Sequence, residues 1–404
     1  MTMKIAQINT TCGAGSTGKI CVSVSQLLSR RDVENYVLYT QGKSSYPLGI
    51  KFSFDAYKKI QALKSRILGN GGFNSHLATV NLIRHLKKIR PDAIHIHNIH
   101  GHDCDLTMLF RFIKRHNIKL FWTFHDCWAF TANCPHFAFA GCDQWKTECR
   151  RCPQIRRTSW FFDRSKTLFQ RKKNLFSGLD LTIVTPSQWL ADLVKESFLK
   201  EYPVKVIHNG IDLGIFKPTE SDFRQRYGIP EEKAVLLGVA FGWGVRKGLD
   251  VFVELARRLD PEKYQIVLVG TDDKTDKLLP ENIISIHRTQ NQTQLAEIYT
   301  AADLFVNPTR EENYPTVNME AIACGTPVLT FRTGGSPEIL IDKTGSLVPC
   351  DDIDALEQEI HRICTEKPFS QADCLERAKS FDMNERFEEY VKLYEERSVG
   401  GVSL

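Results

Sequence analysis

The chain has 404 residues, of which 42% are hydrophobic and 25% charged, and its formal net charge is +5. This is an ordinary globular composition, and the length favours two domains over one. No stretch reaches the roughly eighteen consecutive apolar residues of a membrane span. The N-terminus MTMKIAQIN leads straight into a strand pattern without the apolar core of a signal peptide, so we expect a cytoplasmic protein.

The charge is unevenly distributed along the chain. Residues 1–200 contain 30 Lys and Arg against 13 Asp and Glu, whereas the remainder contains 23 against 35. A basic N-terminal half indicates an anionic partner, which could be a phospholipid surface, a diphosphate-linked acceptor or nucleic acid. Basic helices kept for solubility would give the same count.

A strand pattern over residues 4–9 is followed by a glycine-rich turn that opens into an amphipathic helix. Gly13, Gly15 and Gly18 match the dinucleotide-binding fingerprint, but the second strand ends without the acidic residue that would hold a ribose. The same turn fits a Walker A frame, except that Ile20 stands where Ser or Thr must bind magnesium. The remaining interpretation is a glycine turn whose backbone approaches a phosphate.

Polar residues gather around the next strands. His95 and His97 share one face of a strand by alternation, which is typical of buried histidines. The string Asp103-Cys104-Asp105 has the D-x-D pattern of a metal-binding motif, but Asp105 stands where the following helix needs its N-cap. His125 and Asp126 come directly after another strand, at the sheet edge where ligands of open α/β sheets collect.

The segment from Cys127 to Pro153 is the most unusual part of the chain. Its last four cysteines are spaced C-x7-C-x6-C-x2-C, and a closing C-x2-C is a common chelating spacing for tetrahedral zinc. The segment has too few aliphatic residues to fold alone, so a metal ion or docking on the domain must hold it. Structural zinc, free buried thiols and disulfides all remain open for these residues, which are Cys134, Cys142, Cys149 and Cys152.

A run of cations with interleaved aromatic residues follows directly. Contact with anionic lipid at a membrane interface requires this mixture, and so does binding of single-stranded nucleic acid. The cations are Arg150, Arg151, Arg156, Arg157, Arg164, Lys166, Arg171, Lys172 and Lys173, and the aromatic residues are Trp160, Phe161, Phe162 and Phe169.

The stretch from Asn307 to Ile339 contains two glutamates separated by seven residues, then a short helix, a Gly-Thr-Pro turn, an apolar strand and a Gly-Gly pair. A loop with an acid at its mouth and a helix with unpaired N-terminal amides can hold the hydroxyls and the phosphate of one ligand, because the amides and the helix dipole favour an anion. The amides expected to donate are those of Val317, Asn318 and Met319.

This stretch, with its flanking strings A-x-x-C-G-T-P-V and T-G-G-S-P-E, resembles the E-x7-E segment of the retaining transferases in glycosyltransferase family 4. The resemblance implies that Glu312 lies near the donor sugar, that Glu320 binds the ribose hydroxyls and that Lys247 neutralises the donor diphosphate in place of a metal. The residues expected to contact the donor nucleotide are Gly13, Gly15, Gly18, Arg246, Lys247, Tyr314, Thr316, Val317 and Glu320.

One position departs from the family pattern. The usual arginine, five residues before the lysine, is Gly242 in this chain. Arg246 is a candidate substitute, but it is adjacent to Lys247 and neighbouring helical residues do not share a face. The source of the second cation therefore stays open.

The string H-D-C-W-A-F-T, followed by the spaced cysteines and W-K-T, resembles the colanic-acid-type exopolysaccharide transferases within this family. Such enzymes extend lipid-diphosphate-linked oligosaccharides at the cytoplasmic face of the membrane. The resemblance implies that His125 lies close to the donor sugar and the acceptor, with Asp126 as its orienting partner. A capping role for Asp126 is the alternative.

The resemblance implies an α/β chain with the GT-B fold, in which two doubly wound Rossmann-like domains face one another across a cleft. We expect an acceptor-side domain over residues 1–201 with the cysteine-rich insertion at 127–153, and a nucleotide-sugar-binding domain over residues 202–380. The terminal helix within residues 381–404 is expected to cross back to the first domain.

The predicted function is transfer of a sugar, with retention, from a nucleotide-sugar donor to a lipid-linked oligosaccharide in bacterial capsule, exopolysaccharide or O-antigen synthesis. We expect a peripheral enzyme on the inner face of the membrane, with no cofactor for catalysis and no nucleic acid partner. Displacement on one face is favoured over a covalent intermediate, because no carboxylate is clearly placed as a nucleophile. The alternative is a nucleic-acid-binding protein with a zinc-stabilised basic module on a degenerate nucleotide-binding fold, and a P-loop NTPase is a third, opposed by Ile20.

Overall fold

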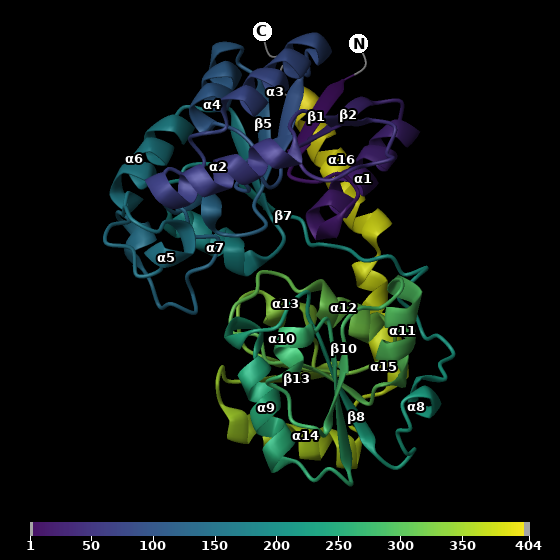
Figure 1. Cartoon of the computed structure of the whole chain (residues 1–404). Helices are drawn as coiled ribbons and strands as arrows, with labels where there is room; N and C mark the ends of the chain where they lie inside the picture. The colour runs from purple at the N-terminus through teal and green to yellow at the C-terminus, as the bar shows by residue number, and fades with distance from the viewer. Residues whose placement is uncertain (1–2, 400–404) are drawn as a thin grey trace. The chain divides into compact units, whose positions relative to one another are not determined.

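The computed structural model describes residues 3–399, which form two compact units (Figure 1). The N-terminal unit comprises residues 3–208 with 387–399, and the C-terminal unit comprises residues 209–386. Each is a parallel β-sheet in which most successive strands are connected through helices, so the predicted doubly wound α/β class is confirmed. Within the described range, no helix combines the length and apolar content needed to cross a membrane.

The N-terminal sheet has seven strands in the order β3-β2-β1-β4-β5-β6-β7. The chain adds β2 and β3 on one side of β1 and then returns to add β4 on the other. The carboxyl ends of β1 and β4 therefore flank a topological switch point, where open α/β sheets bind ligands. The strands are β1 (Lys4–Asn9), β2 (Glu34–Tyr39), β3 (Gly49–Lys51), β4 (Ala93–Ile96), β5 (Lys119–Thr123), β6 (Leu181–Thr185) and β7 (Val204–Val206), and the helices are α1 (Gly15–Arg30), α2 (Asp55–Leu68), α3 (His76–Ile89), α4 (Leu106–Arg115), α5 (Ile155–Thr158), α6 (Ser165–Phe176) and α7 (Gln188–Glu196).

The C-terminal sheet has six strands in the order β10-β9-β8-β11-β12-β13, with its switch point between β8 and β11. Both faces of the sheet carry an apolar core. The strands are β8 (Ala234–Val239), β9 (Tyr264–Val269), β10 (Ile283–Ile286), β11 (Leu304–Asn307), β12 (Val328–Phe331) and β13 (Gly345–Val348), and the helices are α8 (Phe223–Arg226), α9 (Leu249–Arg258), α10 (Asp273–Asp276), α11 (Gln292–Ala301), α12 (Thr316–Ala323), α13 (Ser336–Ile339), α14 (Ile353–Glu366) and α15 (Gln371–Ala378).

The chain passes from one unit to the other at two places. Residues 204–206, which were expected after the domain boundary, form the edge strand β7 of the N-terminal sheet, and the units divide between His208 and Asn209. Helix α16 (Met383–Val399) belongs to the N-terminal unit from Phe387 onward. There the Tyr394 hydroxyl lies 2.5 Å from Nδ1 of His95.

Candidate functional site

The C-terminal unit brings Lys247 and Glu312 into contact at its switch point. Lys247 ends the 3-10 turn η3 (Val245–Lys247), which follows β8, and Glu312 lies in the loop that follows β11. The ammonium and carboxylate groups form an ion pair, with side chains that are 24% and 23% exposed. Two residues that the sequence assigns to different parts of one donor therefore lie side by side.

Two glycines allow the neighbouring loops to pack closely around this ion pair. Gly248 has φ +77°, and a Cβ atom there would lie 2.4 Å from the carbonyl oxygen of Pro308. Gly334 has φ +54°, and a Cβ atom there would lie 1.6 Å from the carbonyl oxygen of Glu312. Both positions exclude any larger residue in this backbone arrangement, which explains why residues 248 and 334 are glycines.

Arg310 holds the two loops together. Its guanidinium donates from Nη1 and Nη2 to the carboxylate of Asp250, at 2.8 Å each, and from Nε to Asp351 at 2.5 Å. Its backbone amide donates to the carbonyl of Arg246 at 3.0 Å. Arg246 in turn donates from Nη1 to the carbonyl of Glu311 at 3.3 Å, so this candidate second cation is bonded to the Glu312 loop.

Helix α12 contributes backbone groups and one acid. The Asn318 amide, which was expected to donate to a ligand, donates to the Pro315 carbonyl at 3.2 Å. Glu320 accepts a hydrogen bond from the Tyr299 hydroxyl at 3.2 Å. Tyr314 is buried in the core, so contact with a nucleotide would involve its backbone and not its ring.

In the N-terminal unit, the glycine turn closes the connection from β1 to α1. Gly13 and Gly15 have φ angles of +77° and +67°, and the Gly13 amide donates to the Gly18 carbonyl at 3.0 Å. A Cβ atom on Gly18 would lie 2.5 Å from the Thr11 hydroxyl oxygen. The turn is exposed at Gly13 and Gly15, which is the arrangement that lets backbone amides reach a phosphate.

His125 is held by a buried chain of hydrogen bonds that fixes its tautomer. The Gln7 side-chain amide donates to the Cys21 carbonyl at 3.0 Å, so its oxygen faces Nε2 of His97, 3.2 Å away. Nε2 of His97 must therefore carry the proton, and Nδ1 of His97 accepts from Nε2 of His125 at 3.2 Å. Neutral His125 is consequently the Nε2–H tautomer, with its lone pair on Nδ1.

At the carboxyl end of β5, Asp126 is ionised and His125 is neutral. Burial lowers the pKa of His125 to about 4, which keeps the ring neutral. Burial also disfavours the charged form of Asp126, but His100 at 2.7 Å and the Trp128 amide at 2.8 Å outweigh it and lower the pKa of Asp126 to about 2. The carboxylate of Asp126 is thus bonded to His100 and to the turn, whereas His97 orients His125.

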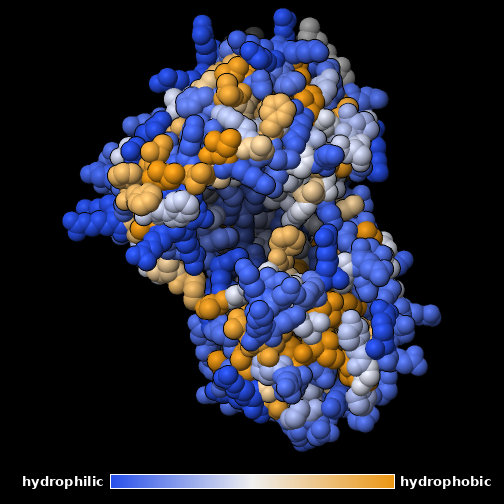
Figure 2. Space-filling view, in the orientation of Figure 1, coloured by the Kyte–Doolittle hydropathy of each residue, from blue (hydrophilic) through white to orange (hydrophobic). Residues whose placement is uncertain are grey.

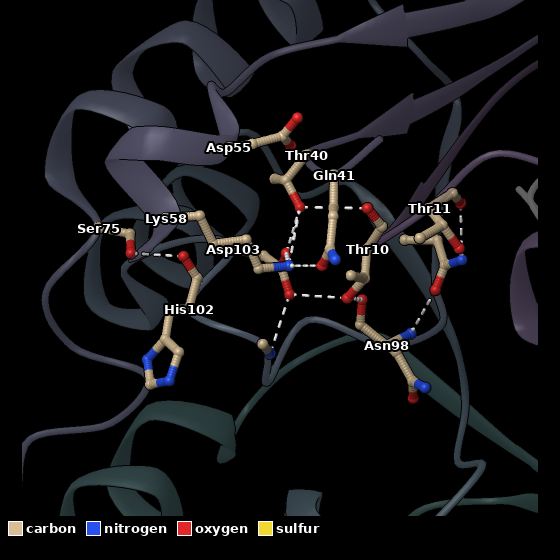
Figure 3. A network of polar contacts seen from close by, with 12 residues as sticks. Thr10, Thr11, Thr40, Gln41, Asp55, Lys58, Ser75, Asn98, His102 and Asp103 are labelled. Atoms are coloured by element: carbon tan, nitrogen blue, oxygen red, sulfur yellow. Dashed lines mark hydrogen bonds and ion pairs between the residues drawn. The ribbon is translucent and has the colours of Figure 1, made fainter. Parts of the chain in front are cut away.

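A second network holds the loop after β4 in place (Figure 3). The buried carboxylate of Asp103 pairs with the Lys58 ammonium at 2.8 Å and accepts from the hydroxyls of Thr10, at 2.9 Å, and Thr40. The ends of β1 and β2 are therefore tied to helix α2 and to this loop. Asp105 caps helix α4 with a 3.0 Å hydrogen bond, so the D-x-D string has structural roles, as predicted.

The last four cysteines of the insertion lie in the same unit and are half-buried. Sγ of Cys134 and Sγ of Cys152 are 4.0 Å apart. All of the cysteines, which lie within the described range, are free thiols, so the disulfide alternative finds no support.

The sequence did not assign His97, Arg310 and Gln7 to the sites. His97 directly follows β4, and Arg310 lies three residues after β11, so the strand-end rule could have found both. Gln7 lies inside β1, where the pattern carries no sign of its role.

Two family models match the chain. Residues 18–214 match the model described as Glycosyltransferase Family 4, and residues 219–381 match the model described as Glycosyl transferases group 1. The first match covers most of the N-terminal unit, and the second covers most of the C-terminal unit.

Individual proteins are similar over the whole chain. The Escherichia coli (strain K12) protein described as "Putative colanic acid biosynthesis glycosyl transferase WcaC" is 24% identical to this chain. The match covers 97% of this chain and 100% of that protein. Sucrose-phosphate synthase from Thermosynechococcus elongatus superposes with a TM-score of 0.74 at 17% identity, covering 98% of this chain and 100% of that one. HepE of Anabaena, in complex with UDP and glucose, has a TM-score of 0.69 at 14% identity, with 98% and 100% covered. These structural likenesses show the fold.

Proposed function

Because the chain belongs to glycosyltransferase family 4 and has a GT-B fold, we propose that it transfers a sugar from a nucleotide-sugar donor to a lipid-diphosphate-linked oligosaccharide, with retention, in the synthesis of a bacterial surface polysaccharide. Members of this family need no cofactor for catalysis. The comparisons match glycosyltransferases over both units and give no support to the nucleic-acid-binding alternative.

The ion pair between Lys247 and Glu312 is the observation that carries this proposal. Departure of a nucleoside diphosphate leaves negative charge on its terminal phosphate, and a cation fixed before the reaction stabilises that charge without reorganisation. Glu312 fixes the Lys247 ammonium, and the first amides of α12 follow in the same loop. The carboxylate also offers an acceptor for a sugar hydroxyl beside the diphosphate site.

We propose displacement on one face of the sugar. The bond from the anomeric carbon to the diphosphate oxygen breaks while the acceptor oxygen bonds to the same face, and the acceptor proton passes to the departing phosphate oxygen. Glu312 is bonded to Lys247, which favours a positioning role over a nucleophilic one. His125, neutral and with its lone pair on Nδ1, is suited to accept a hydrogen bond from a hydroxyl.

The test is a transfer assay with the purified protein, a lipid-diphosphate-linked oligosaccharide and a panel of nucleotide sugars. UDP-sugars come first, because HepE was crystallised with UDP and glucose. We expect one nucleoside diphosphate released for each sugar added, and an anomeric configuration in the product, measured by NMR, equal to that in the donor. Inversion would reject the mechanism, and failure of every nucleoside diphosphate to stabilise the protein in a thermal-shift screen would reject the donor class.

For the acceptor side, we propose that the N-terminal unit binds an anionic membrane surface through helix α2. The usual amphipathic pattern is reversed in this helix. Its buried face consists of Lys58, Gln61 and Ser65, whereas an apolar stripe faces solvent. Trp160 donates its amide to the Arg66 carbonyl at 2.7 Å, which places an aromatic segment at the carboxyl end of α2. The resulting α2 patch consists of Ile60, Leu63, Ile67, Trp160, Phe161 and Phe162, which are between 37% and 70% exposed.

Hydrophobic residues gather over the face that carries α2, with hydrophilic ones around them (Figure 2). Exposed cations accompany the α2 patch, so it combines apolar insertion with attraction to anionic headgroups. These cations are Lys59, Lys64, Arg156, Arg157 and Arg164.

Vesicle flotation tests this surface. We expect the protein to bind vesicles that contain anionic phospholipid more tightly than neutral ones, and the double variant L63S/F161S to lose at least tenfold in binding. L278S removes an exposed leucine of the C-terminal unit, 64% exposed, and serves as the control that should bind like the unmodified protein. Equal binding by the double variant and by L278S would reject the α2 patch.

A further inference from the structure

The cysteine-rich insertion consists mainly of irregular backbone. It contains two 3-10 turns, and the one-turn helix α5 follows it before α6. Phe130, Phe137 and Trp145 form its buried aromatic cluster, with Phe137 and Trp145 stacked at 4.8 Å between ring centroids. Cys142 and Cys149 pack against the core that contains these rings, and Sγ of Cys134 lies 4.0 Å from Sγ of Cys152. The four sulfurs thus occupy one region.

A buried lysine from another element meets this region. Lys172, on helix α6, is fully buried, and its ammonium donates to the carbonyls of Trp128 at 2.6 Å and Thr131 at 3.2 Å. The ammonium also lies 3.3 Å from the centroid of the Trp128 ring. Among residues 3–399, no carboxylate lies within ion-pair distance of it. Carbonyl groups and a ring face supply no net negative charge.

Burial disfavours the charged form of Lys172 and lowers its pKa well below the usual range. Three groups act in the opposite direction and favour the ammonium, in decreasing order Cys149, Asp126 and Cys134, and Asp126 is already paired with His100. The sulfurs are therefore the counter-charge that the structure offers. Thiols supply that charge only after they lose their protons, which metal binding causes.

We propose that Cys134, Cys142, Cys149 and Cys152 bind one zinc ion as a tetrathiolate, with Lys172 as the buried cation that offsets its charge. Each sulfur loses its proton on binding, so Zn²⁺ with four thiolates carries a net charge of −2, which the ammonium reduces to −1. Zinc suits this set because it prefers four tetrahedral ligands, and soft thiolates select it over hard cations.

Binding requires the sulfurs to draw together. Four thiolates at about 2.3 Å from zinc would lie about 3.8 Å from one another. Cys134 and Cys152 already approach this separation, at 4.0 Å. In the part of the chain that the structure describes, the group with three ligand atoms within 4.8 Å of one another is Asp273, Asp276 and His287, of which Asp273 and His287 are exposed, and not the cysteines. Cys142 and Cys149 must therefore move inward.

The zinc site would support the loop that carries Asp126. Lys172 is bonded to Trp128 and Thr131, and the Trp128 amide is bonded to Asp126. The site is thus structural, and its test does not depend on transferase activity.

Zinc content of the purified full-length protein, prepared without chelators, tests the proposal. We expect about one zinc per chain, sulfur ligands at about 2.3 Å by X-ray absorption, and loss of the zinc in C149S. In K172M, competition with a chromophoric chelator should show binding at least tenfold weaker, as for other outer-shell partners, whereas K173M, which removes the adjacent exposed lysine, should match the unmodified protein.

Less than a tenth of an equivalent of zinc would overturn the proposal, and so would a disulfide between any two of the four cysteines in mass spectrometry. Equal affinity of K172M and K173M would remove Lys172 from it. If C149S does not fold, native mass spectrometry of the unmodified protein decides: one bound zinc that a chelator strips supports the site, and a metal-free mass rejects it.

Discussion

At the switch point of the N-terminal unit, side chains hydrogen-bond one another in the series Gln7, His97 and His125, whereas the same edge of the C-terminal unit is formed by an ion pair and by closely packed glycine backbone. The two sheets follow the same winding rule, so topology places both edges but does not decide their chemistry. A neutral network suits contact with sugar hydroxyls, and a fixed cation suits a departing diphosphate. The difference therefore supports our proposal of acceptor chemistry in one unit and donor chemistry in the other.

The largest effect should come from removing the cation of the C-terminal unit. K247M should lower kcat/KM about a thousandfold, or about 4 kcal/mol, because it removes the cation that Glu312 fixes beside the proposed diphosphate site. E312Q should also lower kcat sharply while leaving the thermal midpoint within a few degrees. K263M removes a lysine whose side chain is 74% exposed and should transfer sugar normally. Normal turnover by K247M would move the donor site elsewhere.

In the N-terminal unit, the largest loss of stability should follow from D103A. This change leaves the Lys58 ammonium, whose side chain is 11% exposed, without its carboxylate, and breaking a buried ion pair from one side costs about 3 to 5 kcal/mol. D105A removes a helix cap two residues away and should cost only about 1 kcal/mol. Urea unfolding of both variants measures the difference. Equal costs would show that the Asp103 network does not anchor the loop.

Stability should also fall on mild acidification. Burial lowers the pKa of His95 to about 3 and of His125 to about 4, and it holds the pKa of His97 well below its usual range. Below about pH 6.5 the unfolded chain therefore takes up protons that the folded chain does not, and the free energy of unfolding decreases as pH falls.

His100 acts in the opposite direction. Burial opposes its charge, but Asp126 raises its pKa, so its contribution is present below about pH 6.5 and is lost as pH rises through the raised pKa. His95, His97 and His125 against His100 give a net loss of about 2 to 3 kcal/mol between pH 7 and pH 5.5, and His102, whose pKa burial also lowers, acts in the same direction as the three. Urea titrations at the two pH values measure it, and H95Q should remove about a third of the dependence. A flat profile would contradict the neutral network.

Regular elements with strong patterns could be predicted closely from the sequence. The bounds of β1, predicted over residues 4–9, match the structure, in which all of its residues after Lys4 are buried. Helix α2 was missed, since its polar face is the buried one and its apolar stripe faces solvent, which inverts the usual pattern. The contact of Lys247 with Glu312 could be placed only once the resemblance had assigned both to one donor, because 65 residues separate them.

The sequence patterns could not predict which side chains from different strands contact one another. The sequence offered His125 only its neighbour Asp126 as a partner, whereas the structure gives it a hydrogen bond with His97, 28 residues away. Parallel strands bring their carboxyl ends to one edge, so partners at such an edge are distant in sequence and a local pattern cannot show which two meet.

The smallest effect tests the hydrogen bonds that fix the His125 tautomer. In Q7L the Nε2–H of His97 loses its acceptor, so His97 can exchange tautomers and His125 is no longer held as the Nε2–H form. We expect kcat to fall about tenfold, or about 1.4 kcal/mol, with KM little changed. Long-range proton–nitrogen NMR on histidine-labelled protein should show His125 as one tautomer in the unmodified protein and as a mixture in Q7L.

The matched control is Q265L, in the C-terminal unit. Its glutamine also donates to backbone carbonyls, at 2.9 Å from that of Asn282, but it touches no site residue, so turnover and the His125 signals should not change. A Q7L protein with unmixed His125 signals and normal turnover would show that His97 needs no acceptor to orient His125. The neutral network would then be a packing arrangement, and the contrast between the two edges would rest on the ion pair alone.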